Sequence, residues 1–89
     1  KDGALVADLL KLLLKIRAKE INVASRLLAR SEELEALAAG QREGLAILSD
    51  WRLEQFGADA LALVEGKLGF AVRDGKLLMT RTGEETPCA

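Results

Sequence analysis

The chain of 89 residues has no histidine and no tyrosine, a single cysteine, proline and tryptophan, and two phenylalanines. Without histidine, the common zinc sites and the Ser-His and Cys-His pairs of nucleophilic catalysis cannot be assembled. The single cysteine, Cys88, excludes an internal disulfide framework, which disfavours a small secreted scaffold. These absences indicate a domain with no catalytic residues, bound metal or cofactor of its own.

Long hydrophobic runs are also lacking. The apolar stretch from Leu5 to Ile16 is interrupted by Asp8, Lys11 and Lys15, so it fits neither a signal peptide nor a membrane-spanning helix. Hydrophobic residues make up 49% and charged residues 30%, which is typical of one folded domain. We therefore expect a cytoplasmic protein with no membrane contact. Because the chain opens at Lys1 inside an apolar helical pattern, we also expect a fragment of a longer protein.

What is present is mainly helical periodicity. Apolar residues recur three and four apart, as on one helix face, at Leu5, Leu9, Leu12, Leu13 and Ile16. Val6, Leu10 and Leu14 widen that face, which predicts a first helix set deep in the core or beneath a neighbouring domain. Further short helices are predicted over 24–29, 31–39, 51–56 and 58–65, the third ending at Gly57.

The pattern then changes to the alternation of a strand. Leu68, Phe70 and Val72 alternate, and Asp74-Gly75 precedes a second β-prone run. Asp-Gly between two such runs is a strong hairpin signal, because a type I′ turn needs positive φ at both central residues. We predict a mainly α domain over residues 1–81, with a C-terminal β-hairpin at about 68–81 and a flexible polar tail over 82–89.

Charge is distributed unevenly. Residues 1–30 hold seven basic and three acidic side chains, a net charge of +4, whereas residues 31–89 carry −5. Such a split can mark a surface for an anionic partner, or it can attract the two halves to each other. On the first helix, basic residues four apart form a stripe of Lys11, Lys15 and Lys19.

The basic stripe, with Arg26 and Arg30, could contact phosphates, and a solvated surface is the alternative. Support from base stacking is poor, because Trp51, Phe56 and Phe70 each fit a core position. The acidic cluster around Glu33 fits a helix start rather than a metal site.

The run LLKLLLKIRAKEINVASRLLARSEELEALA resembles the opening of the helicase-and-ribonuclease-D C-terminal (HRDC) domain. Its first helix, brief helix and acid-rich capped helix match 9–20, 23–30 and 31–39. The run LEQFGADALALVEG, residues 53–66, is similar to the closing helices of that family. The span from Val6 to Thr80 resembles the C-terminal part of ribonuclease D-like exonucleases of the alphaproteobacterial type. Shared features are Trp51-Arg52, Phe56-Gly57 and the final Asp-Gly hairpin.

This resemblance implies an HRDC-like bundle of about five helices. Ribonuclease D-like enzymes remove nucleotides from RNA 3′ ends with two metal ions held by an N-terminal exonuclease domain. The acidic motifs of that domain have no counterpart here, so divalent metal is expected only in that upstream domain. The chain would be an accessory domain that positions RNA, with Arg52 joining the other basic residues. The alternative is a structural module whose apolar first helix docks on the exonuclease domain or forms a homodimer.

Overall fold

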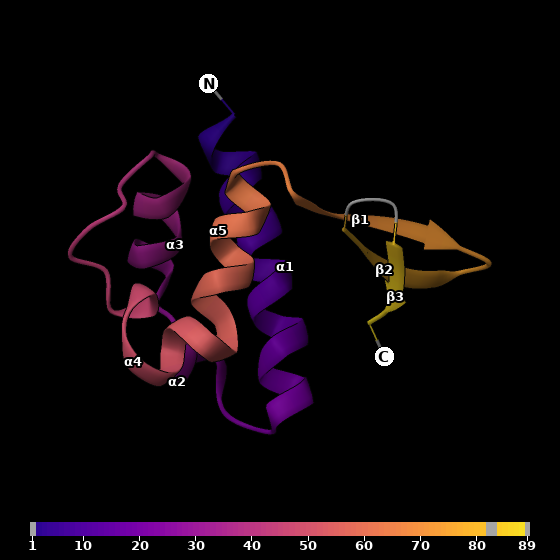
Figure 1. Ribbon diagram of the computed structural model, residues 1–89, viewed down its shortest axis with the longest axis horizontal. Coiled ribbons are helices and arrows are strands. Elements are labelled where there is room, and N and C mark those ends of the chain that lie inside the picture. The colour runs from indigo at the N-terminus through magenta and orange to yellow at the C-terminus, as the bar shows by residue number, and fades with distance from the viewer. Residues whose placement is uncertain (1, 82–83, 89) are drawn as a thin grey trace.

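The computed structural model describes residues 2–81 and 84–88. Helical segments come first and a three-stranded antiparallel sheet follows, on the opposite side of the first helix from α3 (Figure 1). The predicted mainly α fold with C-terminal β-structure is confirmed. In chain order the elements are α1 (Gly3–Ile21), α2 (Ser25–Leu28), α3 (Ser31–Ala38), η1 (Ala46–Leu48), α4 (Asp50–Arg52), η2 (Leu53–Gly57), α5 (Ala58–Val64), β1 (Leu68–Arg73), β2 (Lys76–Arg81) and β3 (Glu84–Pro87).

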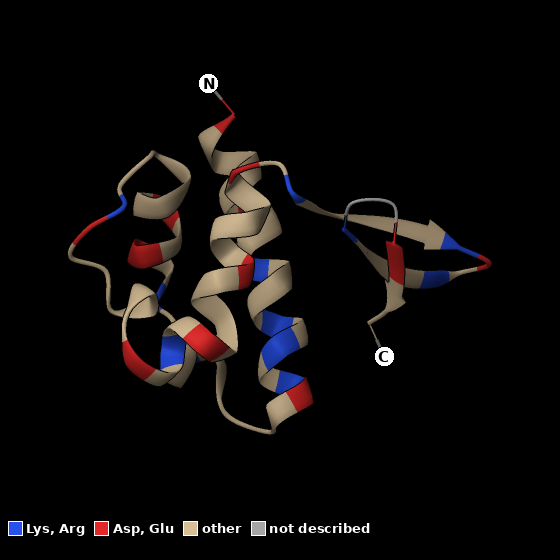
Figure 2. Ribbon diagram, viewed as in Figure 1, with Lys and Arg blue, Asp and Glu red and all other residues tan. Residues whose placement is uncertain are grey.

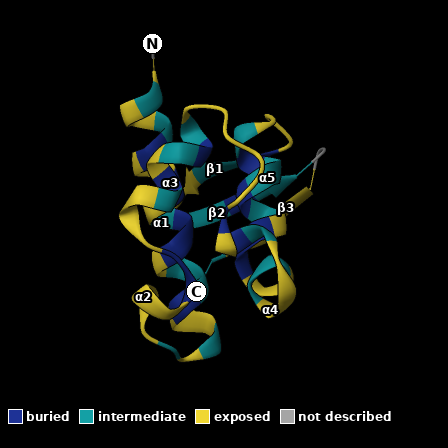
Figure 3. Cartoon of the chain, turned by 90° about the vertical axis from the view of Figure 1, so that its left-hand side faces the viewer, coloured by how far each residue is buried: buried dark blue, intermediate teal, exposed yellow. Residues whose placement is uncertain are grey.

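The core lies where α1 meets α3, α5 and the segment between them, and Figure 3 shows buried residues on these inner surfaces. Leu10, Leu13 and Leu14 are buried as predicted. Leu5 and Leu9, which periodicity also placed inward, are 65% and 43% exposed. The reason is geometric, because α1 is apolar around more of its circumference than its neighbours cover. Within the described residues, no helix is long and apolar enough to cross a membrane.

The first turn of α3 is joined to a distant loop through Glu33. One carboxylate oxygen accepts the backbone N–H of Arg30 at 3.0 Å, and the other accepts the N–H of Ile47 at 3.3 Å. Arg30 occupies the N-cap position and Ser31 is the first helical residue. The acid therefore satisfies two backbone donors that lack helical partners, and it holds η1 against α3.

The prediction that Gly57 ends a helix is wrong. From Asp50 to Val64 the chain stays helical through α4, the π-helical turn η2 and α5, and Gly57 lies within it at φ −58°. A Cβ atom at Gly57 would lie 1.9 Å from the carbonyl oxygen of Ile47. Glycine is thus needed for close backbone approach, not for a stop. Phe56 beside it is fully buried, as predicted.

The predicted hairpin is confirmed. β1 pairs antiparallel with β2, with Phe70 opposite Met79, and both turn residues, Asp74 and Gly75, have positive φ of 54° and 77°. This matches the type I′ requirement that identified the turn in the sequence.

The predicted flexible tail is wrong for residues 84–87, which form β3 and pair antiparallel with β2. Arg81 faces Glu84, and the Cys88 N–H donates to the Leu77 carbonyl at 3.1 Å. Strand pairing uses backbone groups and needs no apolar period, so the polar composition concealed it. The remaining tail residues, 82, 83 and 89, lie outside the described part of the chain.

One carboxylate connects the sheet to the helices. Asp59 on α5 accepts from Arg81 of β2 at 2.6 Å and also forms an ion pair with Arg17 of α1. The Arg17 Nε atom is buried and has no hydrogen-bond partner within the described residues, so the guanidinium is compensated through its two terminal nitrogens, which pair with Glu20 and Asp59.

Candidate nucleic-acid interface

The lysine stripe is confirmed as a feature of one helix. Lys11, Lys15 and Lys19 are all exposed on α1, and Figure 2 shows basic residues concentrated along its lower half. None of the three forms an ion pair within residues 2–81 and 84–88. They form an open row of positive charge along the helix.

The three arginines are arranged differently, because the fold brings them together from separate elements. Arg26 comes from α2, Arg30 caps α3, and Arg52 ends α4. All three line one surface hollow, although the first and the last are 26 positions apart in the sequence. The other lining residues are Leu27, Ala29, Glu33, Gly44 and Ala46. Half of the predicted binding residues thus converge on one place, and the lysines lie elsewhere on α1.

The electrostatics of this hollow favour an anion. Glu33 is its one acidic lining residue, and both of its carboxylate oxygens already accept backbone N–H groups. Arg26 and Arg30 are exposed and take part in no ion pair with the described residues. Three guanidinium groups facing one carboxylate can bind phosphate oxygens through charge-assisted hydrogen bonds.

Arg52 is the most constrained of the three. Its Nε donates to the Leu27 carbonyl at 2.9 Å, and its guanidinium lies 4.7 Å from the centroid of the Trp51 ring. Trp51 is 44% exposed, which contradicts its predicted place in the core. Sequence reasoning missed this residue as a candidate for binding. The available signal was the Trp-Arg pair at the start of a short helix, where one turn cannot bury every side chain.

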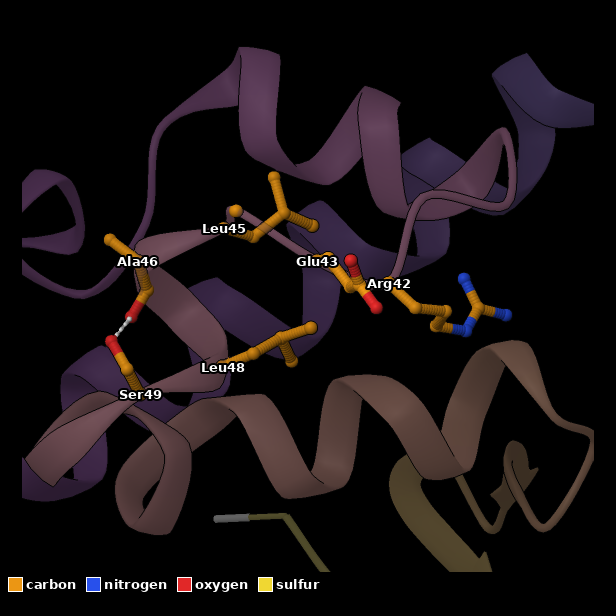
Figure 4. Close-up of a pocket in the computed structure, with 7 residues that line it drawn as sticks. Arg42, Glu43, Leu45, Ala46, Leu48 and Ser49 are labelled. Carbon is orange, nitrogen blue, oxygen red and sulfur yellow. Dashed lines mark hydrogen bonds between the residues drawn. The ribbon is translucent and has the colours of Figure 1, made fainter.

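A neighbouring hollow shares Gly44 and Ala46 with the arginine-lined one, and two of its polar side chains, Arg42 and Ser49, are engaged within the chain (Figure 4). Ser49 Oγ donates to the Ala46 carbonyl at 3.1 Å. The Arg42 guanidinium donates to the Leu37 and Gln41 carbonyls, each at 3.1 Å, and points away from Ala46 and Ser49. The Arg42 contacts satisfy carbonyl groups at the end of α3 and in the residues that follow it, so this guanidinium has a structural role.

In the part of the chain that the structure describes, the acidic residues do not form a set of metal ligands. No three His, Cys, Asp or Glu side chains lie close enough to hold a metal ion in that part. Asp59 is engaged by two arginines, and Glu33 by two backbone N–H groups.

Fold and site together define a small helical domain with an appended antiparallel sheet and an arginine-lined hollow. The chain is 72% identical to ribonuclease D of Sphingobium indicum over 82 residues, covering 92% of this chain and 21% of that protein. It is 52% identical to ribonuclease D of Zymomonas mobilis over 85 residues, covering 96% and 22%. With ribonuclease D of Jannaschia sp. the identity is 43% over 72 residues, 81% of this chain and 18% of that protein.

The resemblance to ribonuclease D is thereby confirmed: the chain is homologous to a segment of proteins of that name. It spans about a fifth of the length of these curated relatives. No protein-family model matches the chain, and no solved structure matches it. The HRDC resemblance itself stays a prediction.

Proposed function

We propose that this chain is a non-catalytic, HRDC-like C-terminal region of a cytoplasmic ribonuclease D-type 3′–5′ exoribonuclease. In this role it positions RNA for a catalytic domain elsewhere in the longer protein, and that domain holds the divalent metal. The observation that carries the proposal is the convergence of Arg26, Arg30 and Arg52 on one hollow.

The chemistry follows from the guanidinium group. Each arginine presents a planar fork of donors that matches phosphate oxygens, and Arg52 is held in place by its bond to Leu27. Such contacts read no base sequence, so they position RNA by its backbone whatever its sequence. The lysine stripe on α1 can add longer-range attraction as a row of mobile point charges.

A salt titration tests this role. The chain is titrated with a fluorescently labelled single-stranded RNA at several salt concentrations between about 50 and 200 mM. With about three phosphates neutralised, the logarithm of the binding constant should fall with the logarithm of salt at a slope of about −2. Affinity that is undetectable at the lowest salt, or that does not change with salt, contradicts the proposal.

Two charge-matched triple variants distinguish the hollow from the stripe. Changing Arg26, Arg30 and Arg52 together to Gln should lower RNA affinity about tenfold or more, because it removes oriented donors as well as charge. Changing the three lysines of the stripe to Gln removes the same charge and should lower affinity by about two- to threefold. Circular dichroism checks that both variants fold. Equal losses in the two variants would contradict the hollow as the binding site.

A second candidate function is docking on protein, and the exposure of Leu5 and Leu9 on α1 favours it. In this proposal the apolar surface packs on the exonuclease domain of the longer protein or on a second copy of the chain. Sedimentation of the chain and a pull-down with that domain test it. Leu5→Gln with Leu9→Gln should abolish association and leave RNA binding unchanged. A monomer without affinity for the exonuclease domain rules this candidate out.

A further inference from the structure

We infer that Trp51 is a base-stacking residue, so that the arginine-lined hollow selects single-stranded RNA by an unpaired base held against the indole. The inference rests on the proposed function and deepens it. Phosphate contacts alone bind RNA of any shape, whereas a stacking residue requires a base that is free of its own stack.

The position of Trp51 in the fold is the first argument. It is 44% exposed in the first turn of α4, while Phe56, five residues further along the same helical run, is fully buried. Asp50 precedes it with a φ of 55°, a left-handed conformation that is unfavourable for a residue other than glycine. The chain thus enters α4 through a strained residue and leaves its one indole at the surface, although burial would be favourable.

The second argument is that the indole is held in place before any ligand arrives. The Arg52 guanidinium lies 4.7 Å from the ring centroid, over the ring, and its Nε is anchored on the Leu27 carbonyl at 2.9 Å. This contact fixes one side of the ring and leaves the rest of its exposed surface for a ligand. Stacking on a preordered ring costs little conformational entropy, which favours binding.

The third argument is the charge beside the ring. Arg52 contacts Trp51 and also lines the hollow with Arg26 and Arg30. A strand whose phosphates lie on these guanidinium groups passes next to the indole, where one base can rotate onto it. Basic residues that follow the backbone, combined with an aromatic ring that takes a base, are the general means of binding single strands. In a duplex each base stays stacked and paired, so it cannot stack on the indole.

Intrinsic fluorescence measures the contact directly, because Trp51 is the only tryptophan and the chain has no tyrosine. The chain is titrated with three RNA probes of about 12 nucleotides, within the range of single-strand site sizes. They are oligoadenylate, an abasic oligomer with the same phosphates, and a blunt duplex. Oligoadenylate should quench the fluorescence and bind at least about fivefold more tightly than the abasic oligomer, as expected for one stacked base. The duplex should bind more weakly without quenching.

Substitutions complete the test, with binding followed on labelled RNA. Trp51→Ala should weaken oligoadenylate binding about fivefold or more and leave the salt slope unchanged, while Trp51→Phe should keep most of the affinity. Val72→Ala is the matched control, because Val72 is 71% exposed on β1, away from the hollow, and its loss should change nothing.

The outcomes separate the inference from the proposed function. If Trp51→Ala binds oligoadenylate like the parent chain and keeps its salt dependence, the proposed RNA-positioning function stands, but the stacking role of Trp51 is wrong. The stacking role is also wrong if the abasic oligomer quenches the Trp51 fluorescence and binds as tightly as oligoadenylate. If the parent chain binds no RNA at low salt, both are wrong. Should Trp51→Ala fail to fold, the quenching data and the comparison of oligoadenylate with the abasic oligomer on the parent chain still decide.

Discussion

The helices and the sheet of this chain are stabilised by different forces. The large side chains with the lowest exposure all belong to the helical part: Phe56, Leu10, Leu13, Leu28, Leu34, Leu37 and Ile47. The strands contribute only Leu68 and Met79 to the buried core of the described residues. Backbone pairing joins the strands to one another, and the Asp59–Arg81 ion pair joins β2 to α5. Apolar truncation should therefore damage the helical part most, and loss of charge should damage the attachment of the sheet.

The two phenylalanines give the sharpest contrast. Phe56→Ala should reduce the free energy of unfolding by about 3–5 kcal/mol, because it leaves a cavity in the centre of the core. Phe70 is half-buried on β1, and Phe70→Ala should cost about 1–2 kcal/mol. Urea denaturation followed by circular dichroism measures both values. Equal losses would show that the sheet is as tightly packed as the helices.

Two glycines test the close approach inside the helical part. Gly57→Ala should destabilise by about 2–3 kcal/mol, because its methyl group meets the carbonyl oxygen of Ile47 and the backbone must move. Gly3 lies in α1 with no atom near its added Cβ, so Gly3→Ala should be neutral or stabilise by up to about 1 kcal/mol. Thermal unfolding compares the pair. A Gly57→Ala variant as stable as the parent chain would exclude the close approach.

Charge removal tests how the sheet is attached. Asp59→Asn keeps the shape of a side chain that is 15% exposed but removes the charge shared by Arg17 and Arg81. The expected cost is about 1–2 kcal/mol, smaller at high salt, because both arginines are partly exposed. Hydrogen exchange should accelerate in β2 more than in α1.

The control for this variant is Arg73→Gln, which breaks an ion pair with Glu85 in which the arginine is 66% exposed. It should cost less than about 0.5 kcal/mol. If Arg73→Gln and Asp59→Asn have equal effects, the Asp59 ion pairs are not what attaches the sheet.

The smallest expected effect concerns Cys88, beyond the end of β3. Partial burial, and secondly the negative charge of Glu20, raise the pKa of the Cys88 thiol above its ordinary value. A raised pKa means less thiolate at pH 8, so iodoacetamide should modify the folded chain more slowly than the urea-unfolded chain. The difference should shrink as the pH rises above the pKa of the folded state. Equal rates at pH 8 would show that the end of the chain does not pack against the helices.

Much of this fold could be read from local signals. The buried face around Leu10 and Leu13 follows from the spacing of apolar residues. The hairpin follows from Asp74-Gly75, because the positive φ angles of its turn depend on these two residues alone. The buried site of Phe56 was also predicted. By contrast, β3 has no apolar period, because its pairing depends on the neighbouring edge of β2 and on backbone groups that every residue carries.

The candidate site also has a part that the sequence could predict and a part that it could not. Its basic residues were identified by type, since only Lys and Arg bring positive charge at neutral pH here. Their grouping could not be predicted, because it depends on how α2, α3 and α4 meet and not on distance along the chain. Trp51 was misplaced for the same reason, since its bulk suggested the core while only the packing of α4 shows that no neighbour covers it.

By itself, the sequence determined the helical class, the hairpin turn and the absence of histidine chemistry, all of which depend on residue type and near neighbours. Only the tertiary structure decided which arginines share a hollow, why Gly57 must be glycine and that an indole lies exposed beside Arg52. The physical reason is range. Periodicity and turn preferences act over a few residues, whereas these features arise from backbone and side-chain contacts between segments that are distant in the chain.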